Sequence, residues 1–425
     1  FVRAAGALGI AGVSGCLRLG NQDEESTDTA TSTGVETATG GAVTDSAAGE
    51  SETTEEPAVD EEATTEETAA DEEETAEEED KSDCSPRTVS SNITEDTTWD
   101  TETCPRIELD GNIKVRNGAT LTIQPGVEII GTSAAKLTIK SDGTLKANGE
   151  PGNPVWFYGG AKVKGYWETI EIESNRANEL SNVKVQDAGG GDWAGVWVRG
   201  SGRLSVENST FTNNDTWGLV AEKGATLPTC SNNAFTSNGT APVSVSSTVL
   251  GALDAASTYT GNDGDDRIEV EAHDVSSEAT WAATDASFFI KGNCRLFAPI
   301  TVDPGANFTF QDGGQLTVKG DGASLTADAS GSETITFEGA AATPGYWEGI
   351  EVETNNPKNV LNNVEIAHGG SGDWAGVWVR GSGRLSVKNS TITNSSTWGI
   401  VIEKGAAIPS FSNNELTNNQ TAPLN

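Results

Sequence analysis

The chain contains 425 residues, of which 64 are acidic and 26 are basic, so its formal net charge is −38 at pH 7. A surface this acidic repels phosphate groups, which argues against nucleic acids and anionic membrane surfaces as partners. The length suits either two or three ordinary domains or one long repetitive domain.

The first sixteen residues resemble the end of an export signal. Residues 1–15 form a weakly apolar run of small residues, too short to span a bilayer, which ends in Val-Ser-Gly-Cys at Cys16. The run is similar to the second half of a twin-arginine signal peptide, and its end is similar to a lipobox, where cleavage precedes a lipidated cysteine. We expect 1–16 to be a signal-peptide remnant and Cys16 to be lipidated. The alternative is an ordinary signal peptide with a chance cysteine.

Residues 17–83 are rich in Thr, Glu, Asp, Ala and Ser and contain no aromatic residue. Such a segment buries too little apolar surface to offset its ordering entropy, and its like charges repel one another. We therefore expect a disordered, extended acidic stalk that holds the rest of the chain away from the membrane.

The cysteines that follow the stalk predict one disulfide. Cys84 and Cys104 would close a loop of about twenty residues, which stabilises a fold by about 3 kcal/mol on the loop-entropy estimate. Cys230 and Cys294 align with apolar residues of the other repeat copy, so we expect both to be buried thiols rather than metal ligands.

Tryptophan recurs at a regular spacing in two copies of a long repeat. The stretch Gly-Asp-Trp-Ala-Gly-Val-Trp-Val-Arg-Gly-Ser-Gly-Arg-Leu-Ser-Val occupies both 191–206 and 372–387. Within each copy, a short apolar run follows a tryptophan every 24 to 27 residues. We expect these tryptophans to form a structural ladder along the repeat, with Trp167, Trp193 and Trp217 in the first copy and Trp347, Trp374 and Trp398 in the second.

Asparagine forms a second column with steps of 26 and 24 residues. Asparagine tolerates left-handed backbone angles, and its amide can bond to the copies above and below. A period in the twenties built from short β-runs predicts a parallel β-helix solenoid rather than a helical repeat. The column consists of Asn182, Asn208 and Asn232 in the first copy and Asn363, Asn389 and Asn413 in the second.

These repeats divide the chain after the stalk into three parts. We expect a first β-helix module at 84–257, an irregular connector at 258–280 and a second, truncated module at 281–425. The connector contains an acidic loop at 262–266. Its carboxylates suit Ca²⁺, but the loop lacks the spacing and terminal glutamate of a helix-loop-helix calcium site. We expect no cofactor, with Ca²⁺ in this loop as the alternative.

The repeat resembles the right-handed parallel β-helix proteins of the pectate-lyase-like superfamily, and in particular exported surface lipoproteins of haloarchaea. The resemblance covers residues 105–425 and rests on the Trp-x-Gly-(Val/Ile) starts, the asparagine column and the initial rung Gly-Ala-Thr-Leu-Thr-Ile-Gln-Pro-Gly-Val at 118–127. It implies an all-β, right-handed parallel β-helix of two tandem modules, with the acidic surface of a halophilic protein. Enzymes, adhesins and inert surface proteins share this fold, so it indicates activity poorly.

Alternation along each short run predicts the outward side chains. It gives two outer columns in the first copy, one of Glu171, Trp197 and Val220 and one of Glu173, Arg199 and Glu222. The second column would be an ion-pair ladder of acid, base and acid. Surface ion pairs of this kind contribute about 0–1 kcal/mol each.

An outward tryptophan beside carboxylate and guanidinium groups suits stacking against sugar rings. The alternative is that a glycine-rich arm folds over each ring. The candidate carbohydrate-binding residues are Trp197, Glu171 and Arg199 in the first copy and Trp378, Glu351 and Arg380 in the second.

These features favour a lipid-anchored protein on the outer face of the cell membrane that binds polysaccharide or envelope proteins without catalysis. One alternative is a polysaccharide lyase or glycoside hydrolase, which needs carboxylates about 5–9.5 Å apart in a cleft. Identical carboxylates recur in both copies, which suits a structural repeat better than one active site. The other alternative is a purely structural envelope component.

Overall fold

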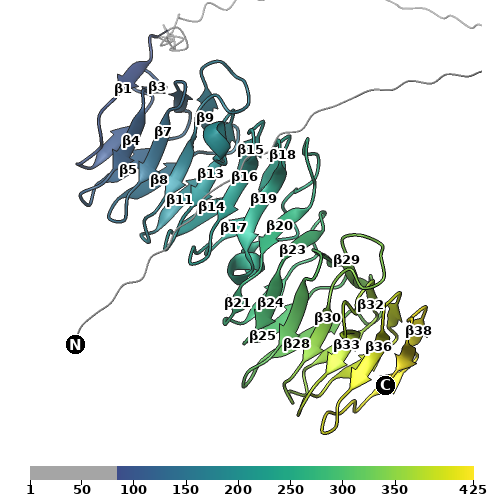
Figure 1. The fold of residues 1–425 in the computed structure, drawn as a ribbon. Coiled ribbons are helices and arrows are strands. Elements are labelled where there is room, and N and C mark those ends of the chain that lie inside the picture. The colour runs from purple at the N-terminus through teal and green to yellow at the C-terminus, as the bar shows by residue number, and fades with distance from the viewer. Residues whose placement is uncertain (1–83) are drawn as a thin grey trace, which may run out of the picture. The chain divides into compact units, whose positions relative to one another are not determined.

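The computed structural model describes residues 84–425, which belong to one compact unit (Figure 1). The expected signal peptide, Cys16 and stalk lie outside these residues. Cys84 and Cys104 form the predicted disulfide, with their Cα atoms 5.9 Å apart. Among the described residues, no helix has the length and hydropathy needed to cross a membrane.

The described chain is a parallel β-solenoid, as the repeat predicts. Three short strands make one turn, and the strands of successive turns pair in parallel. One thirteen-stranded sheet, which we call the spanning sheet, runs through both modules (Figure 1). Its strands are β4 (Asn112–Val115), β7 (Lys136–Ile139), β10 (Thr169–Ile172), β13 (Val196–Val198), β16 (Trp217–Ala221), β19 (Ala241–Ser246), β20 (Ile268–Glu271), β23 (Phe288–Lys291), β26 (Asn307–Phe310), β29 (Ile335–Gly339), β32 (Val364–Ala367), β35 (Thr391–Thr393) and β38 (Glu415–Thr417).

Two further sheets complete the turns of the first module. The seven-stranded sheet contains β1 (Arg87–Val89), β3 (Arg106–Leu109), β6 (Glu128–Gly131), β9 (Val155–Gly159), β12 (Val183–Gln186), β15 (Thr210–Thr212) and β18 (Ala234–Thr236). The six-stranded sheet contains β2 (Thr97–Trp99), β5 (Thr120–Ile123), β8 (Thr144–Asn148), β11 (Asn178–Ser181), β14 (Leu204–Glu207) and β17 (Cys230–Ser231).

Another two sheets complete the turns of the second module. The seven-stranded sheet contains β21 (Asp274–Val275), β24 (Asn293–Leu296), β27 (Gln315–Val318), β30 (Gly349–Val352), β33 (Ala375–Val379), β36 (Trp398–Ile402) and β39 (Ala422–Leu424). The six-stranded sheet contains β22 (Ala279–Trp281), β25 (Pro299–Val302), β28 (Ser324–Asp328), β31 (Val360–Asn362), β34 (Ser386–Lys388) and β37 (Phe411–Ser412). The short 3₁₀ segments are η2 (Gly190–Asp192) and η3 (Ser247–Ala252).

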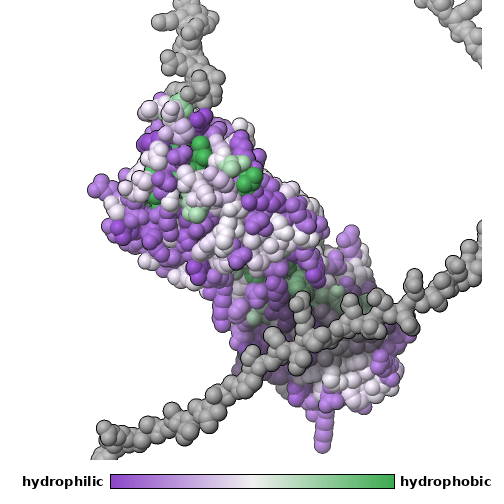
Figure 2. Space-filling view, turned by 45° about the horizontal axis from the view of Figure 1, so that its top comes forward, coloured by the Kyte–Doolittle hydropathy of each residue, from purple (hydrophilic) through white to green (hydrophobic). Residues whose placement is uncertain are grey.

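The core is a continuous column of apolar side chains inside the solenoid. Ile170, Val196 and Leu219 are opposite one another on successive turns, and each is fully buried. Each such side chain stabilises the fold by about 1.5–3 kcal/mol through its removal from water. The outward positions are mostly polar, and the face drawn in Figure 2 is largely hydrophilic. Cys230 and Cys294 are buried free thiols, as predicted.

The asparagine column has the predicted backbone conformation. All six asparagines have φ between 49° and 55°. At the second step of each copy the amides also bond along the column: Asn232 Nδ2 donates to Asn208 Oδ1 at 2.6 Å, and Asn413 Nδ2 donates to Asn389 Oδ1 at 3.2 Å. At the first step they bond elsewhere, because Asn182 Nδ2 donates to Ser181 Oγ and Asn389 Nδ2 donates to Asn362 Oδ1. The predicted backbone conformation is therefore confirmed at all six positions, and the predicted amide ladder at one step of each copy.

The tryptophans do not form one ladder, which corrects the prediction from their spacing. Val196 is the third residue after Trp193, whereas its partner Leu219 is the second residue after Trp217. In the second copy the same shift places Trp398 opposite Ala375 rather than Trp374. In a strand, a shift of one residue changes the face of the sheet to which a side chain points. The indoles of a copy therefore have different surroundings.

The expected connector at 258–280 is part of the solenoid. It contains β20, which pairs with β19 and β23 in the spanning sheet, followed by β21 and β22. By the 181-residue offset between the copies, β20 corresponds to β1, which lies outside the spanning sheet. Because β20 nonetheless joins the spanning sheet, each strand of the second module lies on a different face of the solenoid from its counterpart in the first module. The second module's strands β30, β33 and β36, which are the counterparts of β10, β13 and β16, lie in a different sheet from them.

Candidate functional site

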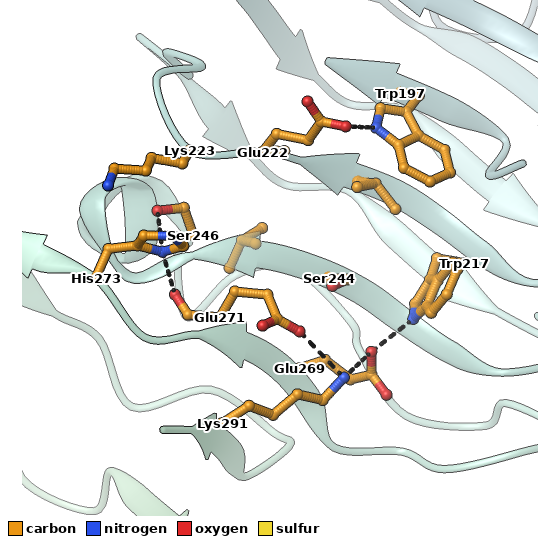
Figure 3. Close-up of a pocket in the computed structure, with 13 residues that line it drawn as sticks. Trp197, Trp217, Glu222, Lys223, Ser244, Ser246, Glu269, Glu271, His273 and Lys291 are labelled. Carbon is orange, nitrogen blue, oxygen red and sulfur yellow. Dashed lines mark hydrogen bonds and ion pairs between the residues drawn. The ribbon is translucent and has the colours of Figure 1, made fainter. Parts of the chain in front are cut away.

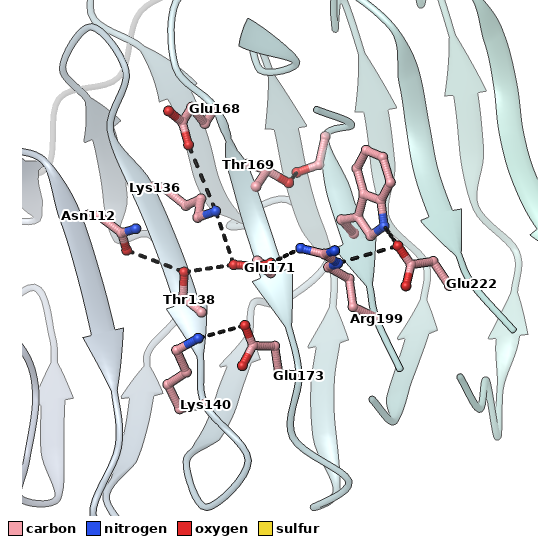
Figure 4. A network of polar contacts seen from close by, with 12 residues as sticks. Asn112, Lys136, Thr138, Lys140, Glu168, Thr169, Glu171, Glu173, Arg199 and Glu222 are labelled. Atoms are coloured by element: carbon pink, nitrogen blue, oxygen red, sulfur yellow. Dashed lines mark hydrogen bonds and ion pairs between the residues drawn. The ribbon is translucent and has the colours of Figure 1, made fainter. Parts of the chain in front are cut away.

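A charged cluster lies on the outer side of β7, β10 and β13 (Figure 4). Glu171 is at its centre, with 4% of its side chain exposed. Its carboxylate contacts Arg199 Nη1 at 3.0 Å, Lys136 Nζ at 3.1 Å and Thr138 Oγ1 at 3.1 Å. Arg199 also contacts Glu222 at 3.3 Å. Charges from successive turns thus form a connected network.

The predicted pairing of Glu173 with Arg199 is wrong. Glu173 pairs with Lys140 on the preceding turn, with 2.6 Å between Oε1 and Nζ. Arg199 instead extends diagonally to Glu171, while its predicted pairing with Glu222 on the following turn is confirmed (Figure 4). Strand alternation predicts the face of each side chain, but it does not fix the direction of a long guanidinium group on that face.

Glu171 is held as an anion. Its burial acts to raise the pKa, but hydrogen bonds from Arg199 and Lys136 outweigh burial, and the pKa lies below its ordinary value. A general acid needs a carboxyl whose pKa is raised toward neutrality. Glu171 has the opposite shift, and its oxygens already accept from three donors. The Glu171 cluster therefore has the chemistry of an ion-pair network.

Trp197 is half-buried on the same face. Its Nε1 donates to Glu222 Oε1 at 2.9 Å, and the edge of Trp193 meets its ring at a centroid distance of 5.2 Å. Trp193 follows the glycine turn η2, and Lys136 Nζ lies 3.7 Å from the centroid of its ring. Trp193, which follows the glycine-rich arm, thus packs against the ring of Trp197, and part of Trp197 remains exposed.

The second copy repeats this arrangement on its own sheet. Arg380 contacts Glu351 at 2.6 Å and Glu403 at 3.2 Å, and Trp378 Nε1 donates to Glu403 at 3.1 Å. The ring centroids of Trp374 and Trp378 are 5.2 Å apart. The six candidate carbohydrate-binding residues therefore form two separate clusters of three rather than one site.

A groove of about 500 Å³ lies beside the first cluster, on the outer side of β16, β19 and β20 (Figure 3). Trp197 and Trp217 line one side, and charged residues line the other. Its aromatic and polar lining residues are Trp197, Trp217, Glu222, Lys223, Ser244, Ser246, Glu269, Glu271, His273 and Lys291.

Ion pairs and hydrogen bonds fix the charged side of the groove. Trp217 Nε1 donates to Glu269 Oε2 at 3.0 Å. Lys291 Nζ lies 2.8 Å from Glu269 and 3.4 Å from Glu271. His273 Nδ1 lies 3.0 Å from the carbonyl oxygen of Glu271. The groove therefore offers indole faces beside carboxylate, ammonium and imidazole groups.

Sequence reasoning found Trp197 but missed this groove. Glu269, Glu271 and His273 belong to the stretch expected to be an irregular connector, and Trp217 was assigned only a structural role. A usable signal was present, because Arg-Ile-Glu-Val-Glu at 267–271 alternates polar and apolar residues, as a half-buried strand does.

The acidic loop at 262–266 uses its carboxylates within the protein. Asp263 pairs with Lys164 at 2.6 Å, and Asp265 accepts from Arg267 Nε at 2.7 Å. Asp266 accepts from the backbone of Asn262 at 2.7 Å. Nowhere in 84–425 do three or more His, Cys, Asp or Glu side chains gather in a group that could hold a metal ion.

Comparison with known families identifies two regions of this solenoid. Residues 91–187 match the family model described as a pectate-lyase like beta helix domain. Residues 300–424 match the family model described as a right handed beta helix region. No curated protein and no solved structure matches the chain. The chain therefore contains β-helix domains of the pectate-lyase-like, right-handed type.

Proposed function

We propose that this is a cell-surface β-helix protein that binds polysaccharide, without cleaving it, in the groove of the spanning sheet. The observation that carries the proposal is the pair of tryptophans, Trp197 and Trp217, which both face one groove. Hydrogen bonds to Glu222 and Glu269 hold the two indoles in place. Rigid aromatic faces of this kind provide large contact areas at a small cost in conformational entropy.

The polar lining suits sugar hydroxyl groups. Carboxylate oxygens of Glu269 and Glu271 accept hydrogen bonds, and the ammonium group of Lys291 donates them. Ser244 and Ser246 also line the groove and add hydroxyl groups. Binding sites commonly combine an apolar surface with a few placed polar groups that fix the orientation of the ligand.

The charges around the groove support binding rather than catalysis. Glu222 accepts from Trp197 and Arg199, and Glu269 accepts from Trp217 and pairs with Lys291. Glutamates held in this way orient their partners, whereas hydrolysis needs one carboxyl that is free to give up a proton.

A glycan array with the full chain tests this proposal, together with an assay for reducing ends and unsaturated products on every glycan that binds. We expect binding to extended polysaccharides without product formation. Product formation would establish a lyase or hydrolase instead. Binding to no glycan would contradict the proposal and favour an envelope-protein partner or a purely structural role.

We also propose that the protein is exported and anchored through Cys16 on the outer face of the cell membrane. The support is the Val-Ser-Gly-Cys sequence, followed by the acidic segment 17–83. Mass spectrometry of the mature protein from its native host is expected to show a first residue at Cys16 with a lipid mass. An unmodified Cys16, or a first residue beyond it, would remove the anchor.

A further inference from the structure

The two copies of the charged cluster differ at one buried position. In the first copy, Lys136 Nζ lies 3.1 Å from Glu171, 3.9 Å from Glu168 and 3.7 Å from the ring centroid of Trp193. The first residue of β27, the equivalent strand, is Gln315. The partners of the lysine are retained in the second copy as Glu348, Glu351 and Trp374. The second copy therefore keeps a lysine's surroundings without the lysine's charge.

Gln315 does not replace the contacts that Lys136 makes in the first copy. Gln315 is 7% exposed, and its Nε2 has no hydrogen-bond partner. Its Oε1 accepts from Thr317 Oγ1 at 3.0 Å, and the same hydroxyl lies 3.4 Å from Glu351 Oε2. The Thr317 hydroxyl group thus links the amide of Gln315 to the carboxylate of Glu351. Burial and the charge of Glu351 raise the pKa of Glu348, which is the shift expected where a neighbouring positive charge is missing.

Rotating the side-chain amide of Gln315 by half a turn gives its unpaired Nε2 a hydrogen-bond partner. Amide nitrogen and oxygen exchange places in such a turn, so Nε2 would donate to Thr317 Oγ1 while the hydroxyl donates to Glu351. The amide oxygen would then be free to act as a ligand. Carboxylate and amide oxygens bind hard cations, and the face of an indole attracts ammonium and similar cations.

We propose that Glu348, Glu351, Gln315 and the face of Trp374 bind a monovalent cation of ammonium size, in the place that the Lys136 ammonium group occupies in the first copy. The cation is either a potassium ion or the ammonium group of an amine. Glu348 is partly exposed and Trp374 is half-buried, so the position is open to solvent. The site lies apart from the groove, and the proposal does not depend on polysaccharide binding.

Thallium(I) provides the test, because it resembles potassium and ammonium in size and quenches the fluorescence of an indole that it contacts. The full chain is titrated with thallous acetate while tetramethylammonium acetate keeps the ionic strength constant. We expect one saturable quenching step above the linear collisional background. Gln315→Lys supplies the ammonium group internally and is expected to remove the step. Lys136→Gln empties the equivalent position of the first copy and is expected to double the amplitude of the step.

Competition separates the two sources of the cation. Displacement of thallium by potassium but not by methylammonium indicates an ion site, and displacement by methylammonium indicates a site for amines. The absence of a saturable step in the wild-type protein would overturn the proposal. So would an unchanged step in a folded Gln315→Lys variant, or an unchanged amplitude in Lys136→Gln, which serves as an independent test if Gln315→Lys does not fold.

Discussion

Four tryptophans of the first copy occupy four different environments, although the sequence spaces three of them regularly. Trp167 is 1% exposed inside the solenoid and donates to the carbonyl oxygen of Gln186. Trp193 lies under Lys136, and Trp197 donates to Glu222. Trp217 donates to Glu269 across the groove. A period in the sequence therefore predicts where a residue recurs along the solenoid, but the register of each strand decides what it contacts.

At the residue scale, the sequence correctly predicted the side of the strand to which each side chain points, but it predicted only some of the ion pairs. Ile170 and Val196 point inward, and Glu171 and Trp197 are neighbours on the outer side, as alternation requires. The choice of Arg199 between Glu171 and Glu173 depends on Lys140, which already pairs with Glu173. Predicting which of several long side chains pair requires their three-dimensional positions, and these cannot be read from the alternation in the sequence.

The pKa shift of Glu171 predicts how acid affects stability. Because the folded-state pKa is lowered, the contribution of Glu171 is present above the ordinary value of 4.5 and is lost as pH falls through the folded-state pKa. Glu171→Gln removes the buried anion that Lys136 and Arg199 share, so we expect it to lower the free energy of unfolding by about 3 kcal/mol at pH 7. The deficit should shrink as the pH falls toward 3.

Urea denaturation of both proteins at pH 7, 5 and 3 measures this deficit. Glu365→Gln, a change at an exposed position of the spanning sheet, is the control and should cost little at any pH. A deficit for Glu171→Gln that stays constant from pH 7 to 3 would contradict the assignment of Glu171 as an ion-pair centre.

At the scale of the element, short strands are predictable where their turns repeat and difficult to predict where they do not. The asparagine turns precede β12, β15 and β18 at fixed steps, so those strands follow directly from the sequence. Strand β20 is as short as these strands but lacks such a turn, and the acidic loop before it dominates the local composition. Its alternation of polar and apolar residues is the one local signal, and pairing with β19 and β23 stabilises the strand.

The asparagine column predicts which of two substitutions at Asn232 destabilises the protein more. Asn232 has φ 55° and donates to Asn208, so alanine there introduces backbone strain and also removes the hydrogen bond. Glycine removes only the bond, because it accepts positive φ. We expect Asn232→Ala to cost about 1–2 kcal/mol in urea denaturation and Asn232→Gly to cost less.

Asn175→Ala is the matched control for this series, since Asn175 is exposed and lies outside the column. It should leave the unfolding midpoint unchanged. If Asn232→Gly proved less stable than Asn232→Ala, the prediction that asparagine stabilises this turn by accepting the left-handed conformation would be wrong.

At the scale of the whole molecule, the duplication does not produce two equivalent sites. Because β20 joins the spanning sheet, the second copy presents Trp378 and Trp398 on another sheet from Trp197 and Trp217. The groove needs Trp217 from the first module together with Glu269, Glu271 and Lys291 from the turns that follow. No single repeat contains this combination, and the sequence therefore predicts the solenoid well and the groove poorly.

The measurement that tests the groove most directly is the affinity of two matched variants for one glycan identified on the array. Trp217→Ala removes an indole from the groove, whereas Trp398→Ala removes the equivalent indole of the second copy, which does not line the groove. Loss of a stacked aromatic contact of about 1–3 kcal/mol corresponds to roughly a five- to 150-fold weaker affinity. We expect this loss for Trp217→Ala and an unchanged affinity for Trp398→Ala. Equal losses in both variants, or none in Trp217→Ala, would contradict polysaccharide binding in the groove.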